Sequence, residues 1–246
     1  MANVLILGCT SAVASAIAER MAASGDRLYL VGRSSEKLKA VAVALGSAVV
    51  GVRQADFNET DQAASVIAAA FASLGRIDKV LIAHGDLGDQ LRSEADFSHA
   101  RHVINTNYLS VVALLIPLVE RVREQGSCKI AVIGSVAGDR GRPRNFTYGS
   151  AKGALQLYLQ GLRSVLYGSG VEIYSFKLGP VDSPMTIDHK KNFSFTTVER
   201  AARAIHQGMA GKRYTRYVPG YWFWVMLTVR WLPESLFQRL GFLSDR

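Results

Sequence analysis

The strongest constraint on the fold is the regular alternation of short β-branched runs with longer segments of helical period. Continuous apolar runs of strand length are typical of parallel strands buried on both faces, and parallel strands need crossover helices between them. The sequence therefore predicts one α/β domain, a doubly wound parallel sheet of about seven strands with helices on both faces. The predicted strands are Asn3–Leu7, Arg27–Gly32, Ala48–Gln54, Lys79–Ala83, Lys129–Ser135, Glu172–Leu178 and Arg216–Val218, and the predicted helices are Ala12–Ala23, Ser35–Leu45, Glu59–Leu74, Phe97–Gln125, Tyr148–Gly168 and Thr197–Gly208.

A single domain over residues 1–246 is expected, because the chain has no linker, internal repeat or low-complexity stretch. With 49% hydrophobic and 20% charged residues, it has the composition of a folded globular protein. Cys9 and Cys128 are too few for a disulfide framework or a four-ligand zinc site, so no metal site is predicted. The first residues lack the features of a signal peptide, and a cytoplasmic location is expected.

The chain carries a net charge of +9, and its basic residues gather in the last quarter. Such a charge is compatible with nucleic acid, an anionic membrane surface or an anionic substrate. No nucleic-acid-binding motif accompanies the basic residues, so nucleic acid is not an expected partner.

A turn suited to phosphate binding follows the first predicted strand. Small residues there let backbone N–H groups and a helix N-terminus approach a pyrophosphate. The alternative is an ordinary tight turn between a strand and a helix. The residues expected to contact a cofactor are Gly8, Thr10, Ser11, Ala12 and Val13.

The end of the second predicted strand indicates the choice of nucleotide. An acidic residue there would bind the ribose hydroxyls of NAD(H) and repel a 2′-phosphate. Instead the chain has Arg33, which can pair with a phosphate, and Ser34, which can donate to it. The sequence therefore favours NADP(H), although Arg33 could also be solvated or stack on adenine. Asp56, followed by Phe57, is expected to contact the adenine, or else to cap a helix.

The catalytic prediction rests on Ser135, Tyr148 and Lys152. Tyr148 and Lys152 are four residues apart and so project from one face of a helix. A nearby ammonium and a positively charged nicotinamide would lower the tyrosine pKa from about 10 toward the working range. Ser135 could hydrogen-bond the substrate oxygen, and Asn107 could hold a water that relays protons from Lys152. The alternative is that Tyr148 and Lys152 form an ordinary surface pair.

These residues resemble the short-chain dehydrogenase/reductase family over about Ala2 to Thr186. The resemblance implies a Rossmann fold, association as a homodimer or homotetramer, and cofactor contacts from Pro180, Val181 and Ser183. It also implies that Ala83, His84 and Gly85 line the cofactor site. His84 replaces an alanine that is usual in the family, and it either fills the loop or takes part in catalysis. Alanines replace glycines in the phosphate loop.

The loop Gly8–Ala14, the stretch Gly85–Gln90 and the segment Pro219–Pro233 show a weaker resemblance to the decaprenyl-phosphoryl keto-pentose reductase subgroup. Residues 182–196 are expected to form a substrate loop, and residues 217–246 an apolar and basic extension. The aromatic stretch at 217–240 could lie on a membrane surface, contact a second subunit or cover the substrate. Arg140, Arg142 and Arg144 could hold an anionic group of the substrate or be solvated.

The predicted function is hydride transfer between NADP(H) and a carbonyl or secondary alcohol, either a small molecule or a lipid-linked keto sugar. Peripheral contact with the inner face of the cell membrane would fit the second type of substrate. The alternative is a catalytically inactive NADP(H)-sensing interaction protein of the same fold.

Overall fold

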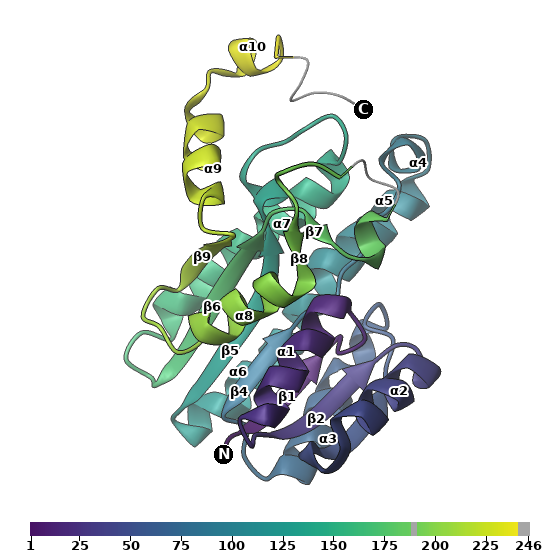
Figure 1. The fold of residues 1–246 in the computed structure, drawn as a ribbon, viewed down its shortest axis with the longest axis vertical. Helices are drawn as coiled ribbons and strands as arrows, with labels where there is room; N and C mark the ends of the chain where they lie inside the picture. The colour runs from purple at the N-terminus through teal and green to yellow at the C-terminus, as the bar shows by residue number, and fades with distance from the viewer. Residues whose placement is uncertain (188–190, 241–246) are drawn as a thin grey trace.

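The structure is a computed structural model that describes residues 1–187 and 191–240, and its centre is a seven-stranded parallel sheet (Figure 1). The strand order is β3-β2-β1-β4-β5-β6-β9, so the chain builds one half of the sheet outward from β1 and then the other half. The predicted doubly wound fold is confirmed. The strands are β1 (Asn3–Leu7), β2 (Arg27–Gly32), β3 (Val49–Gln54), β4 (Lys79–Ile82), β5 (Cys128–Ser135), β6 (Val171–Leu178) and β9 (Thr215–Val218).

Helices cover both faces of the sheet (Figure 1). The helices on one face are α1 (Ala12–Ala23), α2 (Ser35–Leu45) and α8 (Val198–Gly208), and those on the other are α3 (Ala63–Leu74), α5 (Phe97–Ile104), α6 (Ser110–Gln125) and α7 (Phe146–Val165). The remaining helices are the short α4 (Gln90–Ala95), α9 (Trp222–Trp231) and α10 (Glu234–Phe237).

Strand β1 shows why these runs form a sheet buried on both sides. Leu5 and Leu7 belong to the apolar cluster under α3, α6 and α7, whereas Val4 and Ile6 belong to the cluster under α1, α2 and α8. Successive side chains of a strand point to opposite faces, so a strand covered on both faces must be apolar throughout. All four residues are completely buried.

Phe97–Gln125 is one long helix in which a π turn, Asn105–Leu109, joins α5 to α6. It is long and apolar enough to cross a membrane by length and composition. One side of this helix, which includes Leu114, Leu115 and Leu118, is buried against the sheet. We therefore read it as a core helix of the α/β fold.

Three features differ from the predicted pattern. Helix α4 was not predicted, and a small second sheet pairs β7 (Val181–Asp182) with β8 (Thr196–Thr197). Part of the predicted substrate loop (188–190) and the end of the extension (241–246) lie outside the described residues. The described part of the extension forms α9 and α10, which lie beyond the end of β9 at the top of Figure 1.

Candidate active site

The candidate site lies at the carboxyl edge of the sheet, where β1, β2, β4, β5 and β6 all end. In open α/β sheets, ligands bind at this edge. The topology therefore brings the phosphate loop, the Arg33 turn, the loop after β4 and the residues after β5 to one side of the molecule.

The turn after β1 begins with Gly8, which packs so closely on the backbone of His84 that no side chain would fit. Gly8 has φ +87°, and a Cβ built on it would lie 2.6 Å from the backbone nitrogen of His84. The Gly8 and Cys9 N–H groups donate to the carbonyl of Val31, which ties the turn to β2. Ser11 then accepts from the Ala14 N–H at 3.2 Å and caps α1, which begins at Ala12. A helix N-terminus thus opens at this edge, close to Thr10 and Val13, and suits a pyrophosphate.

The turn after β2 presents Arg33 to solvent. Ser34 caps α2 by accepting from the Lys37 N–H at 3.3 Å, and its hydroxyl hydrogen can still donate. Asp56 accepts from the backbone N–H of Asn58 at 3.0 Å, so it shapes the turn after β3 and does not cap α3. This turn also carries Phe57.

The residues after β5 and at the start of α7 meet in one place. The Ser135 hydroxyl lies close enough to the Tyr148 phenol to favour its phenolate form. The Lys152 Nζ lies 5.7 Å from the centre of the Tyr148 ring and donates to the carbonyl of Ile133 at 3.4 Å. The structure therefore brings the three predicted catalytic residues together, and Tyr148 and Lys152 do not form the alternative exposed pair, because Lys152 is only 3% exposed.

Glycines allow α7 to approach the turn after Ser135. A Cβ on Gly138 would lie 2.7 Å from the backbone nitrogen of Gly153, and one on Gly149 would lie 2.8 Å from the carbonyl oxygen of Ala137. The Ser135 Oγ also accepts from the Ala137 N–H at 3.1 Å, and its carbonyl accepts from the Gln156 side chain at 2.9 Å. Backbone contacts therefore fix the positions of Tyr148 and Lys152 relative to Ser135.

Without bound dinucleotide, the Tyr148 pKa lies above its ordinary value, so the predicted lowering depends on the positively charged nicotinamide. Burial raises the pKa of the Tyr148 phenol to about 12, although the hydrogen bond from Ser135 opposes the rise. Burial also lowers the pKa of Lys152 to about 8. Desolvation disfavours the charged form of either group, and the negative charge of Asp86 adds to the rise at Tyr148. At neutral pH the phenol therefore holds its proton.

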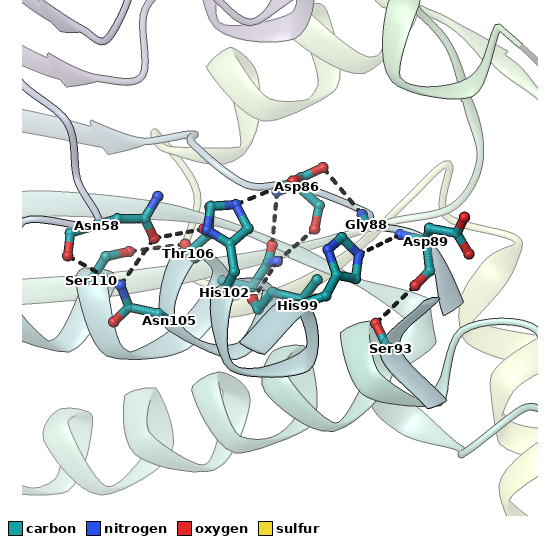
Figure 2. Close-up of polar contacts among 12 residues, drawn as sticks. Asn58, Asp86, Gly88, Asp89, Ser93, His99, His102, Asn105, Thr106 and Ser110 are labelled. Carbon is teal, nitrogen blue, oxygen red and sulfur yellow. Dashed lines mark hydrogen bonds and ion pairs between the residues drawn. The ribbon is translucent and has the colours of Figure 1, made fainter. Parts of the chain in front are cut away.

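Asn107 is completely buried in the π turn. Its amide nitrogen donates to the carbonyls of Asp86 at 2.6 Å and Val103 at 2.9 Å, so both amide hydrogens are used. Any water that Asn107 holds would have to donate to one of its oxygens. Figure 2 shows how Asn58 fixes the turn: its carbonyl oxygens accept from Asn105 and Thr106.

The loop after β4 runs beside these residues. Ala83 continues the pairing of β4 by donating to Leu7, and Gly85 lies between Asn107 and Lys152. A Cβ on Gly85 would lie 2.8 Å from the Asn107 Oδ1 and 3.3 Å from the Lys152 Nζ. The absence of a side chain at Gly85 thus lets the loop approach Asn107 and Lys152 closely. His84 bonds to Ser110 at 2.8 Å and stacks on Phe57 with ring centres 4.2 Å apart.

The segment after β6 closes the other side of the site. Pro180 accepts from the Thr196 N–H at 3.0 Å, Val181 is buried in β7, and Ser183 begins a 3-10 turn. Trp222, at the start of α9, packs directly over Gly179, where a Cβ would lie 2.0 Å from the indole nitrogen. Sequence reasoning missed this contact, which joins the extension to the site.

Arg140 and Arg142, in the segment between Ser135 and Tyr148, bind α9 and the residues that follow it. Arg140 donates to the carbonyl of Leu232 at 2.9 Å and lies over the Phe237 ring at 4.6 Å. The Arg142 guanidinium contacts the Met226 sulfur at 3.3 Å. The hypothesis that these arginines hold a substrate anion, or are solvated, is therefore corrected for Arg140 and Arg142, because both bind the C-terminal segment.

A buried ion pair missed by the sequence analysis lies under the same helix. The Lys177 Nζ lies 2.5 Å from the Asp139 carboxylate, which also accepts from the Tyr217 hydroxyl at 2.6 Å. This network links the turn after β5 to β6 and β9 at the edge of the site. Among residues 1–187 and 191–240, no cluster of side chains could hold a metal ion.

Comparison with known proteins gives a consistent result. A family model described as short chain dehydrogenase matches residues 2–193. An uncharacterized oxidoreductase of Streptomyces coelicolor is 36% identical over 97% of this chain and 95% of its own length, and one of Mycobacterium tuberculosis is 33% identical over 97% of both chains. A crystal structure of an actinorhodin polyketide ketoreductase with NADPH has a TM-score of 0.79 at 19% identity, covering 89% of this chain and 96% of that one.

Proposed function

The chain belongs to the short-chain dehydrogenase/reductase family and is an oxidoreductase of that family; we propose that it transfers a hydride between NADP(H) and a carbonyl or secondary-alcohol carbon. The observation that carries the proposal is the contact between Ser135 and Tyr148 beside the buried Lys152 at the carboxyl edge of the sheet. The turn at Gly8 and the N-terminus of α1 lie along the same edge and would receive the pyrophosphate of a dinucleotide.

When bound, the dinucleotide supplies the hydride that is added to the carbonyl carbon. Tyr148 donates its proton to the carbonyl oxygen, which balances the negative charge that develops there. Ser135 donates a hydrogen bond to the same oxygen. Lys152 would hold the nicotinamide ribose by donating to its hydroxyls, and Asn107 would accept from a water that returns a proton toward Lys152. In the reverse direction Tyr148 accepts the proton from the alcohol.

The preference for NADP(H) depends on the residues at the end of β2. The exposed Arg33 would pair with the 2′-phosphate and Ser34 would donate to it, while Asp56 and Phe57 would border the adenine. Ala83, Val181, Pro180 and Ser183 would line the nicotinamide half. Arg33→Ala should weaken binding of NADPH about tenfold or more and leave NADH binding nearly unchanged, as measured by calorimetry. Equal losses for both nucleotides would contradict the role of Arg33.

The reaction itself can be tested with a panel of ketones and spectroscopic detection of NADPH oxidation. Tyr148→Phe should reduce kcat by about 10²- to 10⁴-fold, because it removes the acid. Ser135→Ala should reduce it less, and NADPH binding should survive in both variants. An active wild type whose activity persists in Tyr148→Phe would overturn the mechanism. Wild-type protein that binds NADPH but turns over no ketone would instead favour the inactive sensor.

The proposed substrate is amphiphilic, such as a lipid-linked keto sugar, reduced at the inner face of the cell membrane. Helix α9 buries Trp222 and Met226 against the site but exposes a second apolar face, with Trp224 67% and Trp231 81% exposed. Arg230 in α9 and Arg239 after α10 are exposed and would suit anionic headgroups. We expect the exposed apolar face of α9, which adjoins the site, to contact the membrane that holds such a substrate.

Substitutions on the exposed face of α9 test this proposal better than removal of the segment, because α9 also packs on the site. Trp224→Ser with Trp231→Ser should slow reduction of a polyprenyl-phosphate keto sugar in anionic vesicles and leave reduction of a short soluble ketone unchanged. Tyr167→Ser, at an equally exposed position between α7 and β6, serves as the control. If the double substitution changed the rates with the lipid-linked and the soluble substrate by the same factor, this result would count against an amphiphilic substrate.

A homodimer or homotetramer is also proposed. The outer faces of α6 and α7 expose Ile116 and Leu157, at 60% and 71%, on the long helices where association is expected. Light scattering after gel filtration should give a mass two or four times that of the chain, and a monomeric mass would contradict the proposal.

A further inference from the structure

His84 places a large polar side chain next to the glycine turn after β1. Its backbone lies against Gly8, and its neighbour Gly85 lies between Asn107 and Lys152. It therefore lies between the turn proposed for the pyrophosphate and the lysine proposed for the nicotinamide ribose. Its ring is held on one face by Phe57, at 4.2 Å between ring centres and 22° between planes.

The hydrogen bonds of Ser110 assign the proton on the imidazole. A serine hydroxyl has one hydrogen, and the Ser110 Oγ lies 2.9 Å from the Thr106 carbonyl oxygen, which can only accept. The Ser110 oxygen must therefore accept in its 2.8 Å contact with His84, and the His84 Nε2 must carry the hydrogen. In a neutral imidazole the other nitrogen, Nδ1, is then a bare acceptor.

The surroundings keep this imidazole neutral. Burial, together with the positive charge of Lys152, lowers the pKa of His84 to about 3. The Nδ1 atom is shut off from solvent and has no hydrogen-bond partner among the residues that the structure describes. Buried polar atoms are almost always paired, so this buried acceptor, next to the turn proposed for the pyrophosphate, calls for a donor from outside the chain.

We propose that the Nδ1 of His84 accepts a hydrogen bond from a ribose hydroxyl of the bound dinucleotide. This rests on the proposed function. Phosphate groups have no donor at neutral pH, and the adenine amine would lie near Asp56 and the carboxamide near Val181. The ribose hydroxyls are the donors that remain between these ends. His84 is thus a cofactor-binding side chain, in addition to the backbone that the loop provides.

Two substitutions separate the two nitrogens of the ring. Asparagine places its Oδ1 acceptor near the position of Nδ1 but is too short to reach Ser110. Glutamine places an amide N–H near the position of Nε2 and can keep the Ser110 bond, but it offers no acceptor at Nδ1. In His84→Asn the NADPH dissociation constant should stay within about threefold of the wild type, while in His84→Gln it should rise about tenfold. Calorimetry measures both, and thermal denaturation reports whether each variant folds.

Nitrogen-15 NMR of the histidine rings gives a readout that does not depend on turnover. The His84 signals, assigned by their loss in His84→Asn, should show hydrogen on Nε2 alone in the free protein, and the Nδ1 shift should change when NADPH is added. Equal NADPH affinity in both variants, equal loss in both, or an Nδ1 signal unaltered by NADPH would overturn the inference. Failure of the wild type to bind NADPH would instead overturn the proposed function.

Discussion

Replacing Lys152 with methionine should make the free protein more stable while removing its activity. Lys152 is 3% exposed, and its ammonium donates to the carbonyl of Ile133 at 3.4 Å, which is long for such a bond. In the described part of the chain no carboxylate pairs with it. A buried charge without a partner disfavours folding, and methionine has a similar shape without the charge.

The pKa of Lys152 sets the size of the effect. Each pKa unit corresponds to about 1.36 kcal/mol, so a fall from 10.5 to about 8 corresponds to about 3 kcal/mol of stability lost at neutral pH. Between about pH 8 and 10.5 the unfolded chain binds more protons at this site than the folded chain does. The contribution of Lys152 therefore becomes less unfavourable as the pH rises through that window.

Thermal denaturation of the free protein at several pH values tests this reasoning. At pH 7 the melting temperature of Lys152→Met should exceed that of the wild type by about 5–10 °C, which is what about 3 kcal/mol produces in a chain of this size. The difference should shrink between about pH 8 and 10.5. Lys39→Met, on the exposed face of α2, should change the melting temperature little. A variant no more stable than the wild type at pH 7, or a difference independent of pH, would refute the argument.

Three further outcomes follow from the geometry. The kcat/KM for ketone reduction should fall as the pH rises above about 8, because the free enzyme then loses the Lys152 ammonium, and a pH profile flat to 9.5 would contradict this. Gly138→Ala should lower the free energy of unfolding by about 1–3 kcal/mol and reduce turnover by pushing α7 away, whereas Gly141→Ala, with nothing within 4 Å, should do neither in denaturant titrations. Arg140→Ala should release α9, seen as faster hydrogen exchange in 222–231 with little change in β1; unchanged exchange would show that the apolar contacts suffice.

The sheet could be predicted from sequence because its signal is local. Every residue of β1 after Asn3 is buried, so the run is apolar throughout, and the polar caps Ser11 and Ser34 mark where the helices begin. Helix α4 was missed because it is six residues long and has no buried residue, so it lacks an apolar period. Its cap, Asp89, was a signal that could have indicated it.

The residues of the candidate site were predicted from spacing, but their surroundings were not. Spacing places Tyr148 and Lys152 on one face of a helix and cannot report how deeply that face is buried, which decides both pKa values. The contacts of Arg140 with α9 and of Lys177 with Asp139 join residues 92 and 38 positions apart. Likewise, an apolar segment such as 222–231 does not reveal that Trp222, Met226 and Val229 form its buried side.

The close backbone contacts of Gly138, Gly149 and Gly153 have a consequence for how enzymes of this kind diversify. They hold the proton-transfer groups within the first two thirds of the chain, whereas the small sheet, α9 and α10 come afterwards. Exchange of the segment after β9 between relatives should therefore change the surface beside the site and leave the proton-transfer groups in place. Asp139 and Arg140 contact Tyr217 and Leu232 in the C-terminal segment. A chimera whose new segment cannot make these two contacts should lose the packing of that segment before it loses the reaction.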